Sequence, residues 1–382
     1  MNFAYSEEQN LLRQSIARFI RENHSFQQRQ TLLTMEDEQA KLWKKMADLG
    51  WLALLTPEND GGLGGSKIDL IILMEEFGKG LMVTPYLAAI VLAATALSQL
   101  GSDEQKEQLL TPLLTGEKTA AFAFLEAQSR YDLLAVQTTS EETANGYLLN
   151  GNKSIVFNGC AADFIIVSAK DSTTGEIQLY WLDRKADGIK TQPYETSDRF
   201  AAAELSFQKT PAQRLNPTDS KEKNSVRSHT HVLEFLADLA TLALCAEALG
   251  AMEILYQSTV SYAKERNQFG VPISSFQVLQ HRMVDMYIHY EKTKSLLMMA
   301  TLTVENTGLS STDIKSRQKA ISALKVQTAL ASKFVGQQAV QIHGGMGMTE
   351  ELAIGHYFKR LTMISMMFGN EDFHLARFAA AS

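Results

Sequence analysis

Two short segments in the last third of the chain carry side chains that suit a phosphorylated, flat-ringed ligand. The first is RNQFGVPISSFQ, which begins at Arg266. Arginine offers a permanently charged, planar fork of donors that matches phosphate oxygens, and we expect Phe269 one helical turn away, where an aromatic face can cover a ring. The plainer interpretation is a surface arginine beside a core phenylalanine.

The second segment is QIHGGMGM, residues 341–348. Gly344, Gly345 and Gly347 remove side chains just after a long predicted helix, so that another backbone or a cofactor can approach closely. Glycines that simply end the helix are the alternative. No strand precedes them, so the dinucleotide-binding G-x-G-x-x-G pattern does not apply. We expect His343 to be a hydrogen-bonded helix-end residue rather than a ligand or base.

The N-terminal part, residues 1–117, is predicted to be helical. Ser6 with Gln9, and Ser102 with Gln105, have the S-x-x-Q spacing of a capping box at a helix start. Residues 37–50 and 67–80 have apolar positions every three or four residues and end in glycine, which favours a left-handed helix stop.

The middle part, residues 118–224, has short apolar or alternating runs typical of strands, separated by turn signals such as Asn150-Gly151 and Asp187-Gly188. A polar run at 216–225 predicts a loop or linker. The last part, residues 225–382, contains only Pro272 and shows helical periodicity. We therefore predict an α+β chain: an N-terminal helical domain, a central β-barrel-like domain and a C-terminal four-helix bundle.

Composition excludes several function classes. The net charge is −7, from 36 Lys and Arg against 43 Asp and Glu, which does not favour nucleic acid as a partner. The two cysteines, Cys160 and Cys245, are far apart and have no metal-ligand spacing, so neither a disulfide framework nor a metal site is expected. The apolar stretch 84–100 is too short to span a membrane and predicts a buried helix. A capped helix is predicted to begin within the first six residues and leaves no room for a leader sequence, so we expect a cytoplasmic protein with no membrane partner.

The arginine-containing segment is followed by the glycine-containing segment, within a helical–β–helical organisation. Together these features resemble the acyl-CoA dehydrogenase family along essentially the whole chain. The PENDGGLGG turn at residues 57–65 adds to the likeness. The sequence around RYDL at 130–133 and GHYFKRLTM at 355–363 is similar to the small-subunit type of pimeloyl-CoA dehydrogenase.

This resemblance implies a cofactor, FAD, and a substrate, an acyl-CoA thioester. It also implies electron-transfer flavoprotein as electron acceptor and a dimer or tetramer, because one subunit binds the pyrophosphate and adenosine half of the FAD of its neighbour. The matching residues here are Arg266, Gln268, Phe269, Gln341, Gly344 and Gly345. Asp238 matches a contact to the pantetheine arm of CoA, and a solvated helix-face carboxylate is the alternative.

The catalytic base of the family is missing from both of its usual positions. In the family, this carboxylate removes the α-proton while a hydride leaves the β-carbon for the flavin. The usual E-G-T triplet is here Phe368-Gly369-Asn370, and the alternative position on the long helix is Ala240. Neither side chain accepts a proton. Asp372 is a weak substitute, on the same face as Phe368 if the helix continues; otherwise it is a helix-start carboxylate.

The flavin-facing pattern of the middle domain also departs from the family. T-E-P-x-A-G-S-D becomes LEAQSRYD, which puts Leu125 in place of the threonine that touches the flavin. K-x-W-I-T-N-G becomes KSIVFNG, with Ile155 for the tryptophan and Phe157 for the threonine. A buried flavin carbonyl left unpaired would cost on the order of 1–3 kcal/mol per lost partner.

These losses predict a heteromeric enzyme, in which this chain completes the FAD site of a second acyl-CoA dehydrogenase-family subunit and has little activity of its own. An active homotetramer with a displaced base is the second interpretation. A nucleic-acid-binding member of the family and a pure scaffold are less favoured, given the charge and the Arg266 motif. The acyl substrate is not readable from the sequence.

Overall fold

The computed structural model describes residues 5–216, 228–306, 308 and 310–381. They form two compact units, each built from separated stretches of the chain. Unit 1 comprises Met1–Thr34, Ser66–Met82 and Thr241–Ser382, and unit 2 comprises Met35–Gly65 and Val83–Ala240. The predicted domain boundary at 224 and most of the predicted linker, 217–225, lie outside the described residues.

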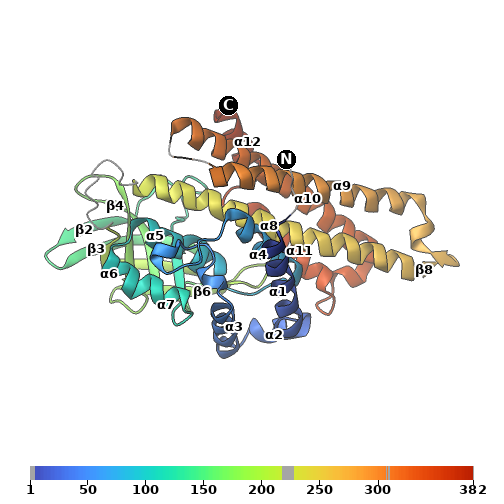
Figure 1. Ribbon diagram of the computed structural model, residues 1–382, viewed down its shortest axis with the longest axis horizontal. Coiled ribbons are helices and arrows are strands. Elements are labelled where there is room, and N and C mark those ends of the chain that lie inside the picture. Colours follow the sequence, from blue (N-terminus) through green and yellow to red (C-terminus); the bar gives the residue numbers. More distant parts are fainter. Residues whose placement is uncertain (1–4, 217–227, 307, 309, 382) are drawn as a thin grey trace. The chain divides into compact units, whose positions relative to one another are not determined.

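Unit 1 is helical apart from one small hairpin. Its long helices α9 and α10 pack along each other, and α11 and α12 both contact α10 (Figure 1). The elements of unit 1 are α1 (Glu7–Asn23), α2 (Phe26–Leu32), α4 (Lys67–Gly80), the greater part of α8 (His229–Glu265), β8 (Asn267–Gln268), β9 (Val271–Pro272), a 3-10 turn (Ile273–Ser275), α9 (Gln277–Asn306), α10 (Ser311–His343), a 3-10 turn (Gly344–Met348), α11 (Ala353–Met366) and α12 (Glu371–Ala380).

The contact between α4 and α8 depends on two glycines. A Cβ atom at Gly78 would lie 1.9 Å from the carbonyl oxygen of Glu247, and one at Gly250 would lie 1.9 Å from that of Glu75. The two helix backbones therefore approach each other more closely than any side chain would allow. A buried pair between Arg360 of α11 and Glu247, with nitrogen–oxygen distances of 2.6 and 2.8 Å, ties a third helix to the same point.

Unit 2 combines short helices with a barrel of strands. Its helices are α3 (Glu36–Asp48), 3-10 turns at Trp51–Ala53 and Glu58–Asp60, a π-helical segment (Leu87–Ala94) continued by α5 (Thr95–Leu100), and α6 (Asp103–Gln105), a second π-helical segment (Lys106–Leu110) and α7 (Thr111–Leu114). Its strands are β1 (Ala120–Ala123), β2 (Thr139–Thr143), β3 (Gly146–Phe157), β4 (Phe164–Asp171), β5 (Ile177–Asp183), β6 (Ile189–Glu195) and β7 (Ala201–Arg214).

The barrel closes through β4. This strand pairs with β2 and with β5, and the path β4–β2–β3–β7–β5 returns to β4, so each of these strands has at least two partners. β1 and β6 extend the sheet from β4 and β7. The interior is filled by alternating apolar side chains such as Leu149, Ile165 and Leu205. Closure leaves few exposed edges and gives a rigid support for the loops at its ends.

The structure confirms the predicted α+β class, with helical regions on both sides of a barrel-like sheet in the sequence. Capping boxes form at Ser6 and at Ser102 as predicted, and the stretch 88–94 is buried. No helix within the described residues combines the length and apolarity needed to cross a bilayer.

Two local predictions are wrong. Asn150-Gly151 is not a turn: it lies within β3, at a bulge where the register with β7 shifts, and the preceding hairpin turns at residues 144–145 instead. The second helix stop uses Leu81, with φ of 49°, rather than Gly80. Gly80 is explained by packing, because its Cβ would lie 2.5 Å from Ile20.

Candidate functional site: an exposed hairpin and an apolar barrel edge

The segment that begins at Arg266 forms a β-hairpin immediately after α8. β8 and β9 pair antiparallel, and Phe269 and Gly270 form the two-residue turn with φ of 55° and 80°. Positive φ at both central residues is the type I′ turn, which Gly at the second position favours. The predicted placement of Phe269 one helical turn from Arg266 is therefore wrong, because the helix ends and the hairpin puts the phenyl ring at its tip.

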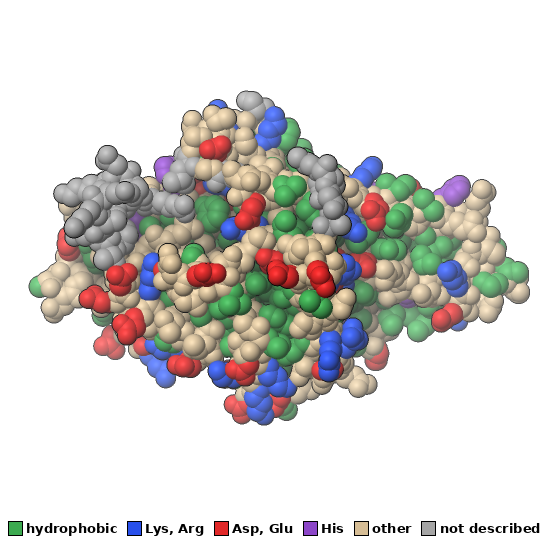
Figure 2. Space-filling model, in the orientation of Figure 1, with side chains coloured by type: hydrophobic (Ala, Val, Ile, Leu, Met, Phe, Trp, Pro, Cys, Tyr) green, Lys and Arg blue, Asp and Glu red, His purple; other side chains and the backbone are tan. Residues whose placement is uncertain are grey.

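Phe269 projects away from the chain. Its side chain is 92% exposed, and its one ring neighbour in the described chain is Phe276, 6.3 Å away between centroids. A core role is therefore wrong as well. A bulky residue at positive φ is uncommon, and here the type I′ turn requires this conformation. Apolar side chains gather at this end of unit 1 in the space-filling view (Figure 2). Arg266 is exposed too and forms no ion pair with any described residue.

The end of α10 lies against the end of α8. The His343 ring stacks on Tyr262, with 4.3 Å between centroids, and its Nδ1 lies 2.8 Å from the carbonyl oxygen of Ala339. His343 is therefore the hydrogen-bonded helix-end residue that the sequence predicts. Arg266 follows Tyr262 by one turn, and Gln341 and Gly344 flank His343. The structure thus brings the two predicted segments together on one exposed end of unit 1.

The glycines after α10 differ in what their surroundings require. Gly344 has φ of 63°, a conformation that favours glycine whatever the space around it. Gly345 has no such constraint, and a Cβ atom there would meet nothing within 4 Å. Nothing in the described chain explains a glycine at 345. Close approach by a molecule outside the chain would explain it.

The barrel edge of unit 2 carries the three altered positions. The backbone N–H of Ser154 donates to the carbonyl oxygen of Leu125 at 2.9 Å, which places the end of β1 beside β3. Ile155 is 43% exposed and has φ of 54°, at a second register shift of β3 against β7. Leu125, Ile155 and Phe157 are all apolar, so their side chains offer no hydrogen bond to a flavin.

A buried ion pair supports this edge from inside the barrel. Nζ of Lys153 lies 2.8 Å from Oε1 of Glu126 and 3.1 Å from Oγ of Ser168. The carboxylate also accepts from the backbone N–H groups of Gln137 and Thr138. Burial opposes ionisation of Glu126, but Lys153 and these hydrogen bonds lower its pKa to about 2. Burial lowers the pKa of Lys153 to about 8, against the effect of Glu126, so both groups are charged at neutral pH.

Neither usual base position holds a carboxylate. Ala240 is fully buried in α8, and Phe368 lies between α11 and α12 with φ of 55°. The helix does not continue through this junction, so the condition that placed Asp372 on the face of Phe368 is not met. Asn370 caps α12 through Phe373, and Asp372 is an exposed residue of its first turn.

The junction around Phe368 is held by buried polar side chains. Nζ of Lys325, a fully buried residue of α10, donates to the carbonyl oxygens of Ile364 and Met367. The ring of buried His374 lies 3.1 Å from the carbonyl oxygen of Phe368 through Nε2 and 3.2 Å from Ser322 through Nδ1. The backbone around Phe368 is thus held by hydrogen bonds from two buried side chains.

Asp238 is 1% exposed, so a solvated carboxylate is wrong for this residue. It lies in the part of α8 that belongs to unit 2, nine residues from the start of that helix. At 1.5 Å per residue this is about 14 Å along the helix axis.

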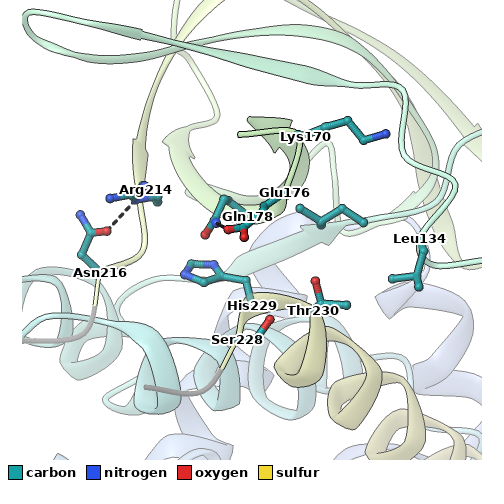
Figure 3. A pocket seen from close by; sticks show the side chains of 11 residues that line it. Leu134, Lys170, Glu176, Gln178, Arg214, Asn216, Ser228, His229 and Thr230 are labelled. Atoms are coloured by element: carbon teal, nitrogen blue, oxygen red, sulfur yellow. Dashed lines mark hydrogen bonds between the residues drawn. The ribbon is translucent and has the colours of Figure 1, made fainter. Parts of the chain in front are cut away.

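A polar cavity of about 630 Å³ opens at the start of the same helix (Figure 3). The strands and the helix start that surround it contribute Lys170, Gln178, Arg214 and His229 among its lining residues. Sequence reasoning missed this cavity, because its residues come from separate segments and share no motif.

Three domain models of one family match the chain. The acyl-CoA dehydrogenase N-terminal domain matches residues 6–117, the middle domain 121–210 and the C-terminal domain 233–382. The chain belongs to the acyl-CoA dehydrogenase family. Members of this family are FAD-dependent oxidoreductases that act on CoA thioesters.

Relatives within the family are diverse. The chain is 27% identical to the probable acyl-CoA dehydrogenase YngJ of Bacillus subtilis over 97% of each chain, and 30% identical to a 3-(aryl)acrylate reductase of Clostridium sporogenes over 86% of each. Among solved structures, a variant of the Tcur3481–Tcur3483 steroid ACAD superposes with a TM-score of 0.85 at 28% identity, covering 98% of this chain and 97% of the other. The ChsE4–ChsE5 complex of Mycobacterium tuberculosis shares the fold, with a TM-score of 0.87 at 24% identity, covering 100% and 98%.

The two candidate regions fit FAD unequally. At the hairpin, a free guanidinium, an exposed aromatic ring and the unexplained Gly345 are the chemistry that a pyrophosphate and an adenine require. At the barrel edge, Leu125, Ile155 and Phe157 are apolar, and no carboxylate stands at position 368 or 240. The side chains of the hairpin therefore fit the nucleotide end of FAD better than those of the barrel edge fit a flavin ring.

Proposed function

We propose that this chain is the non-catalytic subunit of a heteromeric acyl-CoA dehydrogenase. It binds the nucleotide end of an FAD molecule whose ring lies in the barrel of a second family member. Arg266 and Gln268 hold the pyrophosphate, Phe269 covers the adenosine, and Gln341, Gly344 and Gly345 complete the surface.

One observation carries the proposal. The residues that differ from the family pattern and the residues that match it lie in different regions. The groups that we assign to the nucleotide all lie exposed on the hairpin end of unit 1. The altered positions Leu125, Ile155 and Phe157 lie together on the barrel edge of unit 2. Random loss of function would not separate the two sets in this way.

The partner therefore supplies what this chain lacks, namely a carboxylate base and polar groups around the flavin ring. FAD, when bound, supplies the hydride acceptor for α,β-desaturation of the thioester. Electron-transfer flavoprotein is the acceptor that we expect for the reduced enzyme. The likeness to the small-subunit type of pimeloyl-CoA dehydrogenase, together with the two-part name of the steroid ACAD relative, supports a heteromer and suggests a dicarboxylic, alicyclic or steroid side-chain thioester as substrate.

The test compares the purified chain alone with the chain co-expressed with a family member encoded beside it. We expect a pale, inactive single chain and a yellow, active complex, measured by flavin absorbance per chain and by dye reduction with acyl-CoA. A single chain that holds one flavin per copy and turns over a thioester would refute the proposal.

The active homo-oligomer with Asp372 as base is tested with the same protein. Asp372→Asn abolishes turnover with flavin retained only under that interpretation. Because Asp372 is exposed in the first turn of α12, we expect this variant to leave the activity of the complex within twofold of the unmodified complex.

A further inference from the structure

His356, near the start of α11, is a buried histidine whose two ring nitrogens face different elements of unit 1. The residue is 3% exposed. Nδ1 lies 3.5 Å from Nη1 of Arg29 on α2, and Nε2 lies 3.1 Å from the backbone carbonyl oxygen of Glu350. Glu350 ends the stretch of residues 344–350, which we call the glycine segment. The histidine therefore connects the N-terminal part of unit 1 to the segment that follows α10.

These two neighbours determine where the ring hydrogen lies. A guanidinium has only N–H groups and cannot accept a hydrogen bond, so Nδ1 of His356 must be unprotonated to face Arg29. The single hydrogen of a neutral ring is then on Nε2, which donates it to the carbonyl oxygen of Glu350. Both ring nitrogens have a suitable partner only when the ring is neutral.

The charges around the ring favour this neutral form. They come from Arg29 of α2, Glu350 of the glycine segment and Lys359 of α11. Burial lowers the pKa of His356; the bond to the Glu350 carbonyl opposes this effect, and the Arg29 charge adds to it. The ring is therefore neutral at pH 7.

Protonation of His356 would disturb the arrangement. It would set the N–H groups of two cations against each other, with 3.5 Å between Nδ1 and Nη1 of Arg29 in a buried site. The Glu350 carboxylate, 3.3 Å from Nε2, offsets only part of this repulsion, because its side chain is 60% exposed and also pairs with Lys359 at 2.8 Å. A charged ring is therefore expected to leave its position between α2 and the glycine segment.

The glycine segment is fixed at its centre and at its end. At its centre, Gly347 is buried, and a Cβ atom at Gly355 would lie 3.1 Å from its carbonyl oxygen, so the segment packs closely on α11. At its end, Glu350 is bonded to His356. The exposed glycines at 344–345 lie between the end of α10 and these contacts. Their position therefore depends in part on the His356 bond.

We propose that His356 is a positioning residue for the glycine segment. Its neutral ring holds Glu350 against α11, and protonation of the ring breaks this bond and lets the segment open. The inference rests on the proposed function in one respect, namely that residues 344 and 345 contact the nucleotide end of FAD. Acid should therefore loosen the segment in the single chain and speed the release of flavin from the heteromer.

The first test measures hydrogen–deuterium exchange of the backbone amides of residues 344–350 in the single chain, corrected for the effect of pH on the intrinsic exchange rate. A histidine in the opened segment has its ordinary pKa of about 6.5, whereas the closed segment disfavours a proton on this ring. Lowering the pH from 7.5 to 5.5 should therefore speed exchange by up to about tenfold. No change in exchange would overturn the proposal.

His356→Gln separates the charge of the ring from its hydrogen bonds. The amide oxygen accepts from Arg29 and the amide nitrogen donates to the Glu350 carbonyl, but the side chain does not titrate, so we expect slow exchange at both pH values. The matched control, His231→Gln, removes an exposed histidine of α8 in unit 2 and should respond to acid as the unmodified chain does. An acid response that persists in His356→Gln would overturn the proposal and would point to His343, which also borders the segment.

Glu350→Gln keeps the backbone acceptor and removes the carboxylate. The side chain is 60% exposed, so we expect the variant to fold. Its acid response should be at least as large as that of the unmodified chain, because the charge that offsets protonation of His356 is gone. Loss of the response in this variant would assign it to the carboxylate and would equally overturn the proposal.

In the heteromer, the rise of flavin fluorescence after dilution measures flavin release. Release should accelerate by up to about tenfold between pH 7.5 and 5.5, and His356→Gln should remove this acceleration. If exchange responds as expected but flavin release is the same with and without His356→Gln, the positioning role stands and the nucleotide contact of the proposed function is wrong. If flavin release accelerates while exchange in the single chain does not, the positioning role is wrong and the proposed function is untouched.

Discussion

The hairpin end of unit 1 and the barrel edge of unit 2 differ in which part of them matches the family pattern. At the hairpin, the ligand-facing side chains Arg266 and Phe269 match, and the strained turn that presents them is formed. At the barrel edge, the backbone is also built, with Ile155 in a left-handed conformation and Ser154 bonded to Leu125. Its ligand-facing side chains do not match.

The difference shows that two kinds of residue are constrained by different requirements. Buried residues that support the fold are constrained by stability, and residues that face a ligand are constrained by binding. Removing a support such as Lys153 leaves a charge buried without its partner, which destabilises the fold whether or not a ligand binds. A side chain that faces only a ligand carries no such cost. The barrel edge therefore keeps its backbone shape without polar ring contacts. Under the proposed function, the hairpin keeps both its shape and its side chains because the nucleotide end of FAD contacts them.

The largest effect that we expect comes from the support of the barrel edge. Lys153→Met leaves the Glu126 carboxylate buried with no cation and should lower the free energy of unfolding by about 3–5 kcal/mol. Chemical denaturation of the single chain measures this loss. The double variant with Glu126→Gln should recover part of it, since the uncompensated charge is gone. If Lys153→Met lost less than 1 kcal/mol, the ion pair would not be the support that we infer.

The second effect concerns the ligand contacts of the hairpin. Arg266→Ala should weaken flavin retention by the heteromer by about 2 kcal/mol, roughly thirtyfold, because a charge-assisted hydrogen bond is lost. Its stability should not change, since Arg266 makes no ion pair within the described chain. Lys264→Ala, an exposed lysine near the end of α8, is the matched control. Equal flavin loss in both variants would mean that the hairpin acts only through its overall charge.

Much of the fold follows from local sequence signals. The S-x-x-Q pairs predict two helix starts because a capping box involves only residues three apart. The turn at Asn150-Gly151 fails because the same dipeptide also suits a β-bulge, and the pairing of Leu149 with Thr210, far along the chain, decides between them. Helix stops fail in the same way: Gly80 is required by Ile20, which no local pattern reveals.

The candidate site is predictable only where it is contiguous. The residues from Arg266 to Phe269 form a motif, but their conformation was missed, since a motif that resembles a family does not state whether the helix has ended. The cavity at the start of α8 joins Lys170, Arg214 and His229 from separate segments. No spacing along the chain relates them, so only the closed barrel brings them together.

A third prediction uses pH to separate two buried titratable groups of unit 2, His229 and Glu126. The pKa of His229 is about 4 in the folded chain and about 6.5 in an unfolded one, so the fold binds fewer protons there and loses stability as pH falls below 6.5. At pH 5.5 the loss should be about 1.5 kcal/mol. Urea denaturation between pH 7.5 and 5.5 measures it, and His229→Gln should remove this part of the dependence. Glu126 should contribute nothing in this window, because its pKa of about 2 is lowered from 4.5 and its stabilisation is lost only at lower pH.

The smallest effect on the fold should come from Gly345→Ala. This variant most clearly separates an effect on stability from an effect on ligand binding. Its new Cβ meets nothing within 4 Å, and its backbone is not left-handed, so we expect the free energy of unfolding to change by less than about 0.5 kcal/mol. Flavin retention by the heteromer should nevertheless fall severalfold, because the methyl group occupies space that the nucleotide approaches. Leu125→Thr on the barrel edge is the converse control: it restores a hydroxyl at one altered position, and flavin content should not rise while Ile155 and Phe157 remain. Normal flavin content in Gly345→Ala would place the nucleotide elsewhere and would remove the contrast between the two regions.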